Sequence, residues 1–251
     1  MRTLHPIVFV FFFSALAAGC TLARVKSDAP PITHEAFTAV LDDYVSTDGR
    51  VNYNGLQADS LRLNAYLELL ERHHPNGSWT SNQKKAYWIN AYNAFTLRLI
   101  LRNYPTASIK DLAGSLYKIN TPWDIRFIVI EGHDYDLNNI EHDILRKEWQ
   151  DARIHFAINC ASVSCPILHN AAYEAETLDA QLDQAALRFI NDSSRNTLHA
   201  DTPELSRIFK WFSSDFQRDG SLIEFVNRYA SVKLNTSAEI SYKTYDWNLN
   251  E

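Results

Sequence analysis

The sequence lacks the basic excess that is typical of nucleic-acid-binding proteins. Its 24 lysines and arginines are outnumbered by 30 aspartates and glutamates, which gives a net charge of −6, and no basic patch stands out. No low-complexity stretch, internal repeat or glycine-rich phosphate loop following a predicted strand is visible. We therefore expect no nucleic-acid partner and no doubly wound nucleotide-binding sheet.

Cysteine is also scarce, with three residues among 251, whereas aromatic residues are plentiful. A hydrophobic content of 46%, including 12% aromatic residues, is sufficient for the core of one large domain. The six tryptophans and twelve tyrosines indicate aromatic packing around a cleft or in a core. Candidates for the wall of such a cleft are Trp88, Tyr92, Trp123 and Trp247.

The first 20 residues have the pattern of a secretory signal: one arginine, a Phe-rich apolar stretch and small residues before Cys20. The apolar stretch is too short to span a bilayer as a stable helix. Its end, Leu-Ala-Ala-Gly-Cys, is typical of a bacterial lipoprotein cleavage site. We expect a signal peptide over residues 1–19, an acylated Cys20 and a tether over residues 20–33.

No aspartate follows Cys20, so we expect a lipid anchor in the outer membrane, facing the periplasm. The alternative is an ordinary periplasmic or secreted protein, with the leader removed and no anchor.

Residues 34–251 predict a single α+β domain, in which several helices surround one long buried helix and pack on a small mixed or antiparallel sheet. The segment at 81–104 is apolar on nearly all sides and should be that helix. Helices are predicted from periodicity at 34–46, 60–72, 81–104, 139–149, 177–191 and 221–229. Strands are predicted at 126–131, the apolar start of 153–166, 196–200, 204–209 and 239–242.

Residues 153–166 contain both cysteines outside the leader, and His155 precedes Cys160 by five residues. An apolar run followed by small residues and Pro166 predicts a buried strand that enters a tight loop. His155 would lie within the strand and Cys160 where the strand ends. Reactive groups are commonly found in loops held by such a rigid element.

Two further groups of polar residues fall in helices. Asn90 and Asn93 lie three residues apart in the long apolar helix and need hydrogen-bond partners if they are buried. They either tie a neighbouring loop to the helix, or one of them orients a catalytic imidazole or binds a ligand. Asn138 and Glu141 match a capping box, which favours a capping role for Glu141 over a catalytic one. His142 is adjacent.

Four blocks of the sequence resemble, in the same order, the family known as domain of unknown function 547. These blocks are residues 88–94, 140–146, 155–166 and 245–250. The resemblance covers roughly residues 35–250 and implies a shared fold. It implies no reaction, because the family is named for lacking one.

The first chemical interpretation is thiol catalysis. Cys160 would be the nucleophile, and His155 or His142 would be its base or cationic partner. Asn90 or Asn93 would orient the imidazole, as the third member of a triad does. If the protein is an enzyme, these residue types predict a thiol-dependent hydrolase or transferase.

Other interpretations stay open. In an oxidising envelope, Cys160 and Cys165 could form a structural disulfide or a reactive redox pair. A metal site would draw on the same cysteines with Glu141, His142 and His155, but the spacing matches no known site. The competing class is a non-catalytic envelope module that binds a peptide, a glycan or another protein. No cofactor or metal is predicted.

Overall fold

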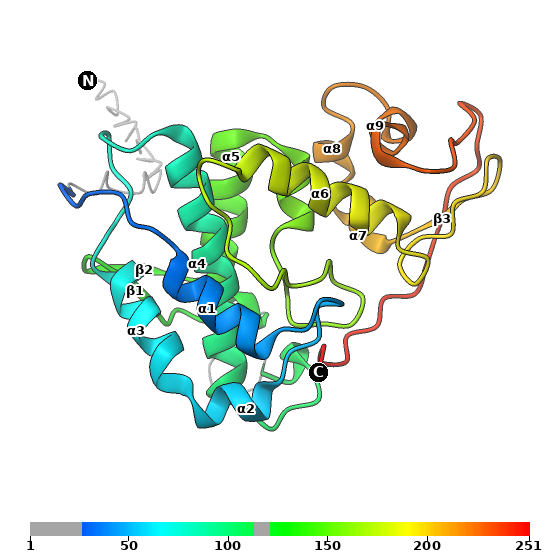
Figure 1. Ribbon diagram of the computed structural model, residues 1–251. Coiled ribbons are helices and arrows are strands. Elements are labelled where there is room, and N and C mark those ends of the chain that lie inside the picture. Colours follow the sequence, from blue (N-terminus) through cyan, green and yellow to red (C-terminus); the bar gives the residue numbers. More distant parts are fainter. Residues whose placement is uncertain (1–26, 113–120) are drawn as a thin grey trace, which may run out of the picture.

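The computed structural model describes residues 27–112 and 121–251, and it confirms an α+β fold with helices arranged around α4 (Figure 1). The α-helices are α1 (Glu35–Tyr44), α2 (Tyr53–Ala58), α3 (Ser60–Glu71), α4 (Ser81–Leu101), α5 (Arg146–Trp149), α6 (Leu178–Asn191), α7 (Arg207–Trp211), α8 (Ser213–Phe216) and α9 (Leu222–Tyr229). Shorter helical segments are η1 (Ile109–Leu112), η2 (Pro122–Asp124), the π-helical η3 (Asn139–Leu145) and η4 (Ala152–Phe156).

The strands form two separate pairs. β1 (Ile128–Ile130) and β2 (His133–Tyr135) are antiparallel, with Val129 opposite Asp134. β3 (Glu204–Leu205) and β4 (Ser241–Tyr242) are parallel and lie far from the first pair along the chain. The small mixed sheet that the sequence predicts is therefore divided between two places in the fold.

Helix α4 is the central element, and its start is fixed by local sequence. The Thr80 side chain accepts a hydrogen bond from the Gln83 backbone, and the Gln83 side chain accepts one from the Thr80 backbone. This capping box satisfies two backbone donors that a helix start leaves free. Nearly every α4 side chain from Lys85 to Ile100 is buried, because neighbouring elements cover the helix on all sides.

The core consists of two hydrophobic clusters. The larger one surrounds α4 and includes the apolar faces of α1 and α3. The smaller one surrounds Phe156 and joins α6, α7, α8 and α9. Phe156 stacks on Phe189 of α6 with 4.9 Å between ring centroids. The two clusters are adjacent in sequence at residues 154–158, and the candidate site is at this boundary.

Residues 152–156 form a 3₁₀ helix and not the start of the predicted strand. The Asp151 side chain accepts hydrogen bonds from the backbone N–H and from Nε of Arg153, at 3.1 and 3.0 Å. Such local side-chain bonds favour a turn over extended backbone. The prediction that His155 lies within a buried strand is therefore wrong, because His155 belongs to this helical turn.

All four other predicted strands are shorter than expected, and those at 126–131 and 239–242 are reduced to Ile128–Ile130 and Ser241–Tyr242. Only Glu204 and Leu205 of the predicted strand at 204–209 are extended, because the Ser206 side chain accepts from the Ile208 backbone and starts α7. Within 196–200, only Thr197 forms a bridge, to Glu204.

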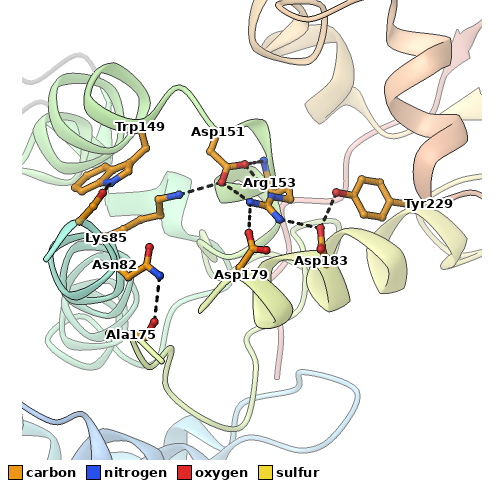
Figure 2. A network of polar contacts seen from close by, with 10 residues as sticks. Asn82, Lys85, Trp149, Asp151, Arg153, Ala175, Asp179, Asp183 and Tyr229 are labelled. Carbon is orange, nitrogen blue, oxygen red and sulfur yellow. Dashed lines mark hydrogen bonds and ion pairs between the residues drawn. The ribbon is translucent and has the colours of Figure 1, made fainter. Parts of the chain in front are cut away.

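A network of charged groups fixes η4 against its neighbours (Figure 2). Arg153 forms ion pairs with three carboxylates, those of Asp151, Asp179 and Asp183. Lys85 of α4 also pairs with Asp151 at 3.0 Å, and the Tyr229 hydroxyl donates to Asp183 at 2.8 Å. Burial alone would raise the pKa of Asp151, but Arg153 and Lys85 outweigh it and lower the pKa to about 2. The network thus ties η4 to α4, α6 and α9.

Candidate functional site

A cleft of about 360 Å³ lies where the two hydrophobic clusters meet. Its walls come from η3, η4, the cysteine loop (residues 159–166), α7 and the segment that follows β4. The predicted site residues that line it are Glu141, His142, His155, Cys160 and Cys165. Five candidate residues from three parts of the chain therefore meet on one concave surface.

The cysteine loop is shaped by Asn159. Its side-chain oxygen accepts from the Ala161 backbone at 2.8 Å, and its amide group donates to the Pro166 carbonyl at 2.7 Å. Ala161 has a φ of 58°, a left-handed conformation that is uncommon for a residue with a Cβ. The chain therefore bends directly after Cys160, within a loop that Asn159 closes.

The segment at 245–250 runs beside the loop and holds it in place. The backbone N–H groups of Val163 and Ser164 donate to the carbonyls of Asn248 and Asp246 at 2.9 and 3.2 Å. In Figure 1 the chain after α9 runs back across the molecule and ends near α2, where the Tyr53 hydroxyl donates to Asn250. These contacts bring Tyr245 to the cysteine loop across 85 residues of sequence.

Three groups surround the Cys160 sulfur. Its Sγ lies 3.2 Å from Ser162 Oγ, 3.3 Å from the Tyr245 hydroxyl and 2.8 Å from Cys165 Sγ. The Ser162 hydroxyl has one proton, which it can give to the sulfur or to the Tyr245 oxygen at 3.1 Å, and the Tyr245 proton is free to point at the sulfur in either case. A thiolate is stabilised by such donors, and it is the nucleophilic form of cysteine.

The two cysteines differ in acidity. Burial would raise the pKa of Cys160, but hydrogen bonds with Cys165, Ser162 and Tyr245 outweigh it and lower the pKa below that of an ordinary thiol. Burial and the adjacent Cys160 raise the pKa of Cys165. The pair therefore combines an easily ionised thiol at the cleft with a protonated thiol behind it. No bond joins the two sulfurs, which lie 2.8 Å apart, and the disulfide stays a prediction for oxidising conditions.

His155 contacts carboxylates rather than a cysteine. Its Nε2 donates to Asp215 at 2.7 Å, and its Nδ1 lies 3.8 Å from Glu141. The ring also stacks on Phe212 with 3.9 Å between centroids. Burial lowers the pKa of His155, whereas Asp215 opposes this change. His155 is therefore held rigidly between two acidic groups.

His142 is held by Arg146, whose guanidinium donates to its Nδ1 at 3.0 Å. Burial and the Arg146 charge lower the pKa of His142, so that the ring is neutral at pH 7. Among the described residues, the hydrogen-bond partners of Cys160 Sγ include neither histidine. The structure thus places both predicted imidazoles in the cleft without pairing either with the thiol.

Glu141 is a cleft residue and not a helix cap. The Asn138 side chain donates to Asp124 instead of completing the predicted capping box, and Glu141 is only 7% exposed. Burial and the nearby Cys160 raise the pKa of Glu141 to about 7, against the opposing charge of Arg146. A carboxyl group with this pKa can both donate and accept a proton near neutral pH.

This raised pKa predicts a pH-dependent stability. The unfolded chain loses the Glu141 proton near pH 4.5, whereas the folded chain keeps it to about pH 7, so folding is favoured below this range and the advantage is lost as the pH rises through 7. We expect Glu141→Gln to lose less thermal stability between pH 5 and about pH 8 than the wild type does. Thermal melts at both values measure this, with the exposed Glu148→Gln as control. Parallel losses in all three proteins would contradict it.

Both asparagines of α4 tie loops to the helix. Asn90 donates to the Tyr173 carbonyl at 2.8 Å and accepts from its backbone N–H at 2.9 Å. Asn93 donates to Ala157 and accepts from the Asn159 backbone, both at 2.9 Å. The loop-tying interpretation is confirmed, and these contacts occupy the amide groups that would otherwise orient an imidazole. Asn93 supports the site indirectly, because it anchors the start of the cysteine loop.

Aromatic residues form much of the cleft wall. Tyr92, Trp123 and Trp247 line it, whereas Trp88 is 3% exposed and packs in the core. Trp211 stacks on Trp247 with 5.7 Å between centroids, and this α7 residue is 44% exposed. The wall therefore offers flat apolar surface next to the thiol.

Sequence reasoning did not identify Asp215, Ser162 or Tyr245 as site residues. One signal for Asp215 is its place between Phe212 and Phe216, since a carboxylate within an aromatic helical stripe needs a partner when buried. Its partners are His155 and Arg146, which lower the pKa of Asp215 although burial would raise it. Tyr245 belongs to the last resembling block, but no spacing rule connects it to Cys160.

Residues 77–190 match the model of the family described as "Protein of unknown function, DUF547". This range contains α4, η3 and the cysteine loop, and the match supports the resemblance seen in the sequence. No curated protein and no solved structure matched the chain.

Within residues 27–112 and 121–251, no three His, Cys, Asp or Glu side chains are grouped so that they could hold a metal ion. In the same ranges no helix is long and apolar enough to cross a membrane. The predicted signal peptide and the lipidation site Cys20 lie outside the described residues.

Proposed function

We propose that the protein is a thiol-dependent hydrolase or group transferase with Cys160 as its nucleophile. The observation that carries this proposal is the surroundings of Cys160 Sγ: two hydroxyl groups and a second thiol lie within hydrogen-bonding distance, on the wall of a cleft. This arrangement stabilises a thiolate without an imidazolium. A stabilised thiolate facing a cleft is the starting state for covalent catalysis.

Glu141 is the proton carrier in this proposal. The Cys160 sulfur attacks the carbonyl carbon of an acyl substrate, and the leaving group departs with a proton from the Glu141 carboxyl. Water or an acceptor hydroxyl or amine then attacks the thioester and returns a proton to Glu141, and the thiolate leaves. His155 and Asp215 are positioning residues, since His155 separates Glu141 from the Asp215 charge.

The aromatic wall supports a second candidate, a binding module without chemistry. Trp123, Trp211 and Trp247 offer flat surface suited to a peptide side chain, a sugar face or an apolar group. Both candidates place a peptide, glycan or protein ligand in the same cleft. They differ in whether Cys160 becomes acylated.

Acylation of the full chain by a panel of 4-nitrophenyl esters tests the difference. We expect a burst of 4-nitrophenolate of one equivalent per protein, with the acyl group found by mass spectrometry in the peptide 154–188, which contains both cysteines and ends at Arg188. Cys160→Ala should lose the burst. Glu141→Gln should keep the acylated peptide but turn over more slowly, and Glu148→Gln should match the wild type. An equal burst from Cys160→Ala would leave only the binding module.

The leader supports a location in the cell envelope, with Cys20 as the lipid-anchored residue and the outer membrane as its site. We expect Cys20→Ser to move the protein from the membrane fraction to the soluble fraction, because acyl chains supply the anchor. Fractionation followed by a high-salt wash measures this. A variant that stays membrane-bound after the wash would rule out the lipid anchor.

A further inference from the structure

Cys165 has no role as a nucleophile in the proposed function, yet it is buried and contacts Cys160 directly. It is 4% exposed, and its sulfur accepts from the Cys160 backbone N–H at 2.9 Å. Cys160 is half-buried and lines the cleft in front of it. A molecule in the cleft therefore meets Cys160 first, with a second thiol already in contact with the same sulfur.

The loop holds the two sulfurs in this arrangement from several sides. Asn159 closes the loop by bonding Pro166, and Arg195 donates to the carbonyls of Cys165 and Val163 at 2.7 and 3.0 Å. With the sulfurs 2.8 Å apart, joining them needs little movement of either side chain. The geometry is that of an attacking thiol and a resolving thiol.

We infer that Cys160 and Cys165 react as a pair with hydroperoxides, Cys160 as the attacking thiol and Cys165 as the resolving thiol. This inference rests on the proposed function, because both need Cys160 to be an accessible thiolate. Oxidation would also stop acyl transfer, since it consumes the nucleophile.

The first step forms a sulfur–oxygen bond. The Cys160 thiolate attacks one peroxide oxygen, the oxygen–oxygen bond breaks, and the departing oxygen takes a proton, which Glu141 in the same cleft can supply. Cys160 becomes a sulfenic acid, and hydrogen peroxide yields water. In the second step the Cys165 thiol attacks the Cys160 sulfur. A disulfide forms, the sulfur–oxygen bond breaks, and the hydroxyl leaves as water with the Cys165 proton.

Treatment of the reduced full chain with equimolar hydrogen peroxide tests the inference. We expect the peptide 154–188 to become lighter by two hydrogens, Cys160 to lose its reactivity with iodoacetamide, and dithiothreitol to reverse both changes. In Cys165→Ser, dimedone should trap a sulfenic acid on Cys160. In Cys160→Ser, Cys165 should stay a thiol at the same peroxide concentration, because it is buried and protonated.

The wild-type protein alone tests the inference, even if a variant fails to fold. If Cys160 alkylates readily but peroxide leaves both thiols intact, or drives Cys160 to a sulfinic acid without a disulfide, the inference is wrong and the proposed function stands. If Cys160 in the reduced chain resists alkylation altogether, both are wrong.

Discussion

Replacing Phe95 by alanine is expected to lower the free energy of unfolding by about 3–5 kcal/mol, the range for removing a large buried side chain. Phe95 lies in the middle of α4 and is fully buried at 0% exposure. Its ring meets the Phe127 ring edge-on, with 6.2 Å between the ring centroids. Elements on several sides pack on this helix, so the space left by the ring cannot close by a small local movement. Denaturant titration of wild type and variant measures the change.

The matched control is Leu61→Ala. Leu61 lies on α3 and is 79% exposed, so its truncation should change the free energy of unfolding by less than about 0.5 kcal/mol. Equal effects at the two positions would mean that α4 is not the central element of the core.

Replacing Tyr245 by phenylalanine is expected to slow alkylation of Cys160 about tenfold at pH 6. The ring stays, but the sulfur loses the donor at 3.3 Å, and a hydrogen bond to a charged group contributes about 1.5–3 kcal/mol. Since one pKa unit corresponds to about 1.4 kcal/mol, the pKa of Cys160 should rise by about one unit or more. At a pH below the pKa, the fraction of Cys160 present as thiolate decreases. The variant's alkylation rate should therefore fall furthest behind that of the wild type at low pH.

The pH–rate profile with iodoacetamide distinguishes this effect from altered access. Near pH 10 Cys160 is ionised in both proteins, and their alkylation rates should converge. Tyr242→Phe, on β4 and without a hydrogen bond to Cys160 Sγ, should reproduce the wild-type profile. A constant slowing of Tyr245→Phe at every pH would indicate that the hydroxyl affects entry to the cleft and leaves the pKa unchanged.

The central helix is predictable from sequence because its signals are local. Thr80, Gln83 and the continuous apolar surface all lie within one segment, and each acts through neighbours three or four residues away. The predicted β1 strand also forms, at Ile128–Ile130. These elements need no knowledge of distant residues.

The site is less predictable because its parts are joined by long-range contacts. Residue types alone predicted that a histidine is the base or cationic partner of Cys160. In the structure His155 instead bonds to Asp215, 60 residues further along the chain. The η4 turn could not be distinguished from a strand, since a short apolar run fits either until Asp151 and Arg153 are seen to bond locally. The capping box predicted at Asn138 and Glu141 does not form, because the Asn138 side chain donates to Asp124 and the Asp136 side chain accepts from the Asn139 backbone instead.

The reach of Tyr245 to the cysteine loop has a consequence for biosynthesis. Tyr245 follows Cys160 by 85 residues, so at about 5–20 residues per second a ribosome makes the thiol roughly 4–17 s before the hydroxyl that polarises it. During this interval Cys160 lacks the hydrogen bond with Tyr245 that helps to lower its pKa. The full acidity of Cys160 is therefore acquired when the segment at 245–250 has folded against the loop, after the rest of the site has been made.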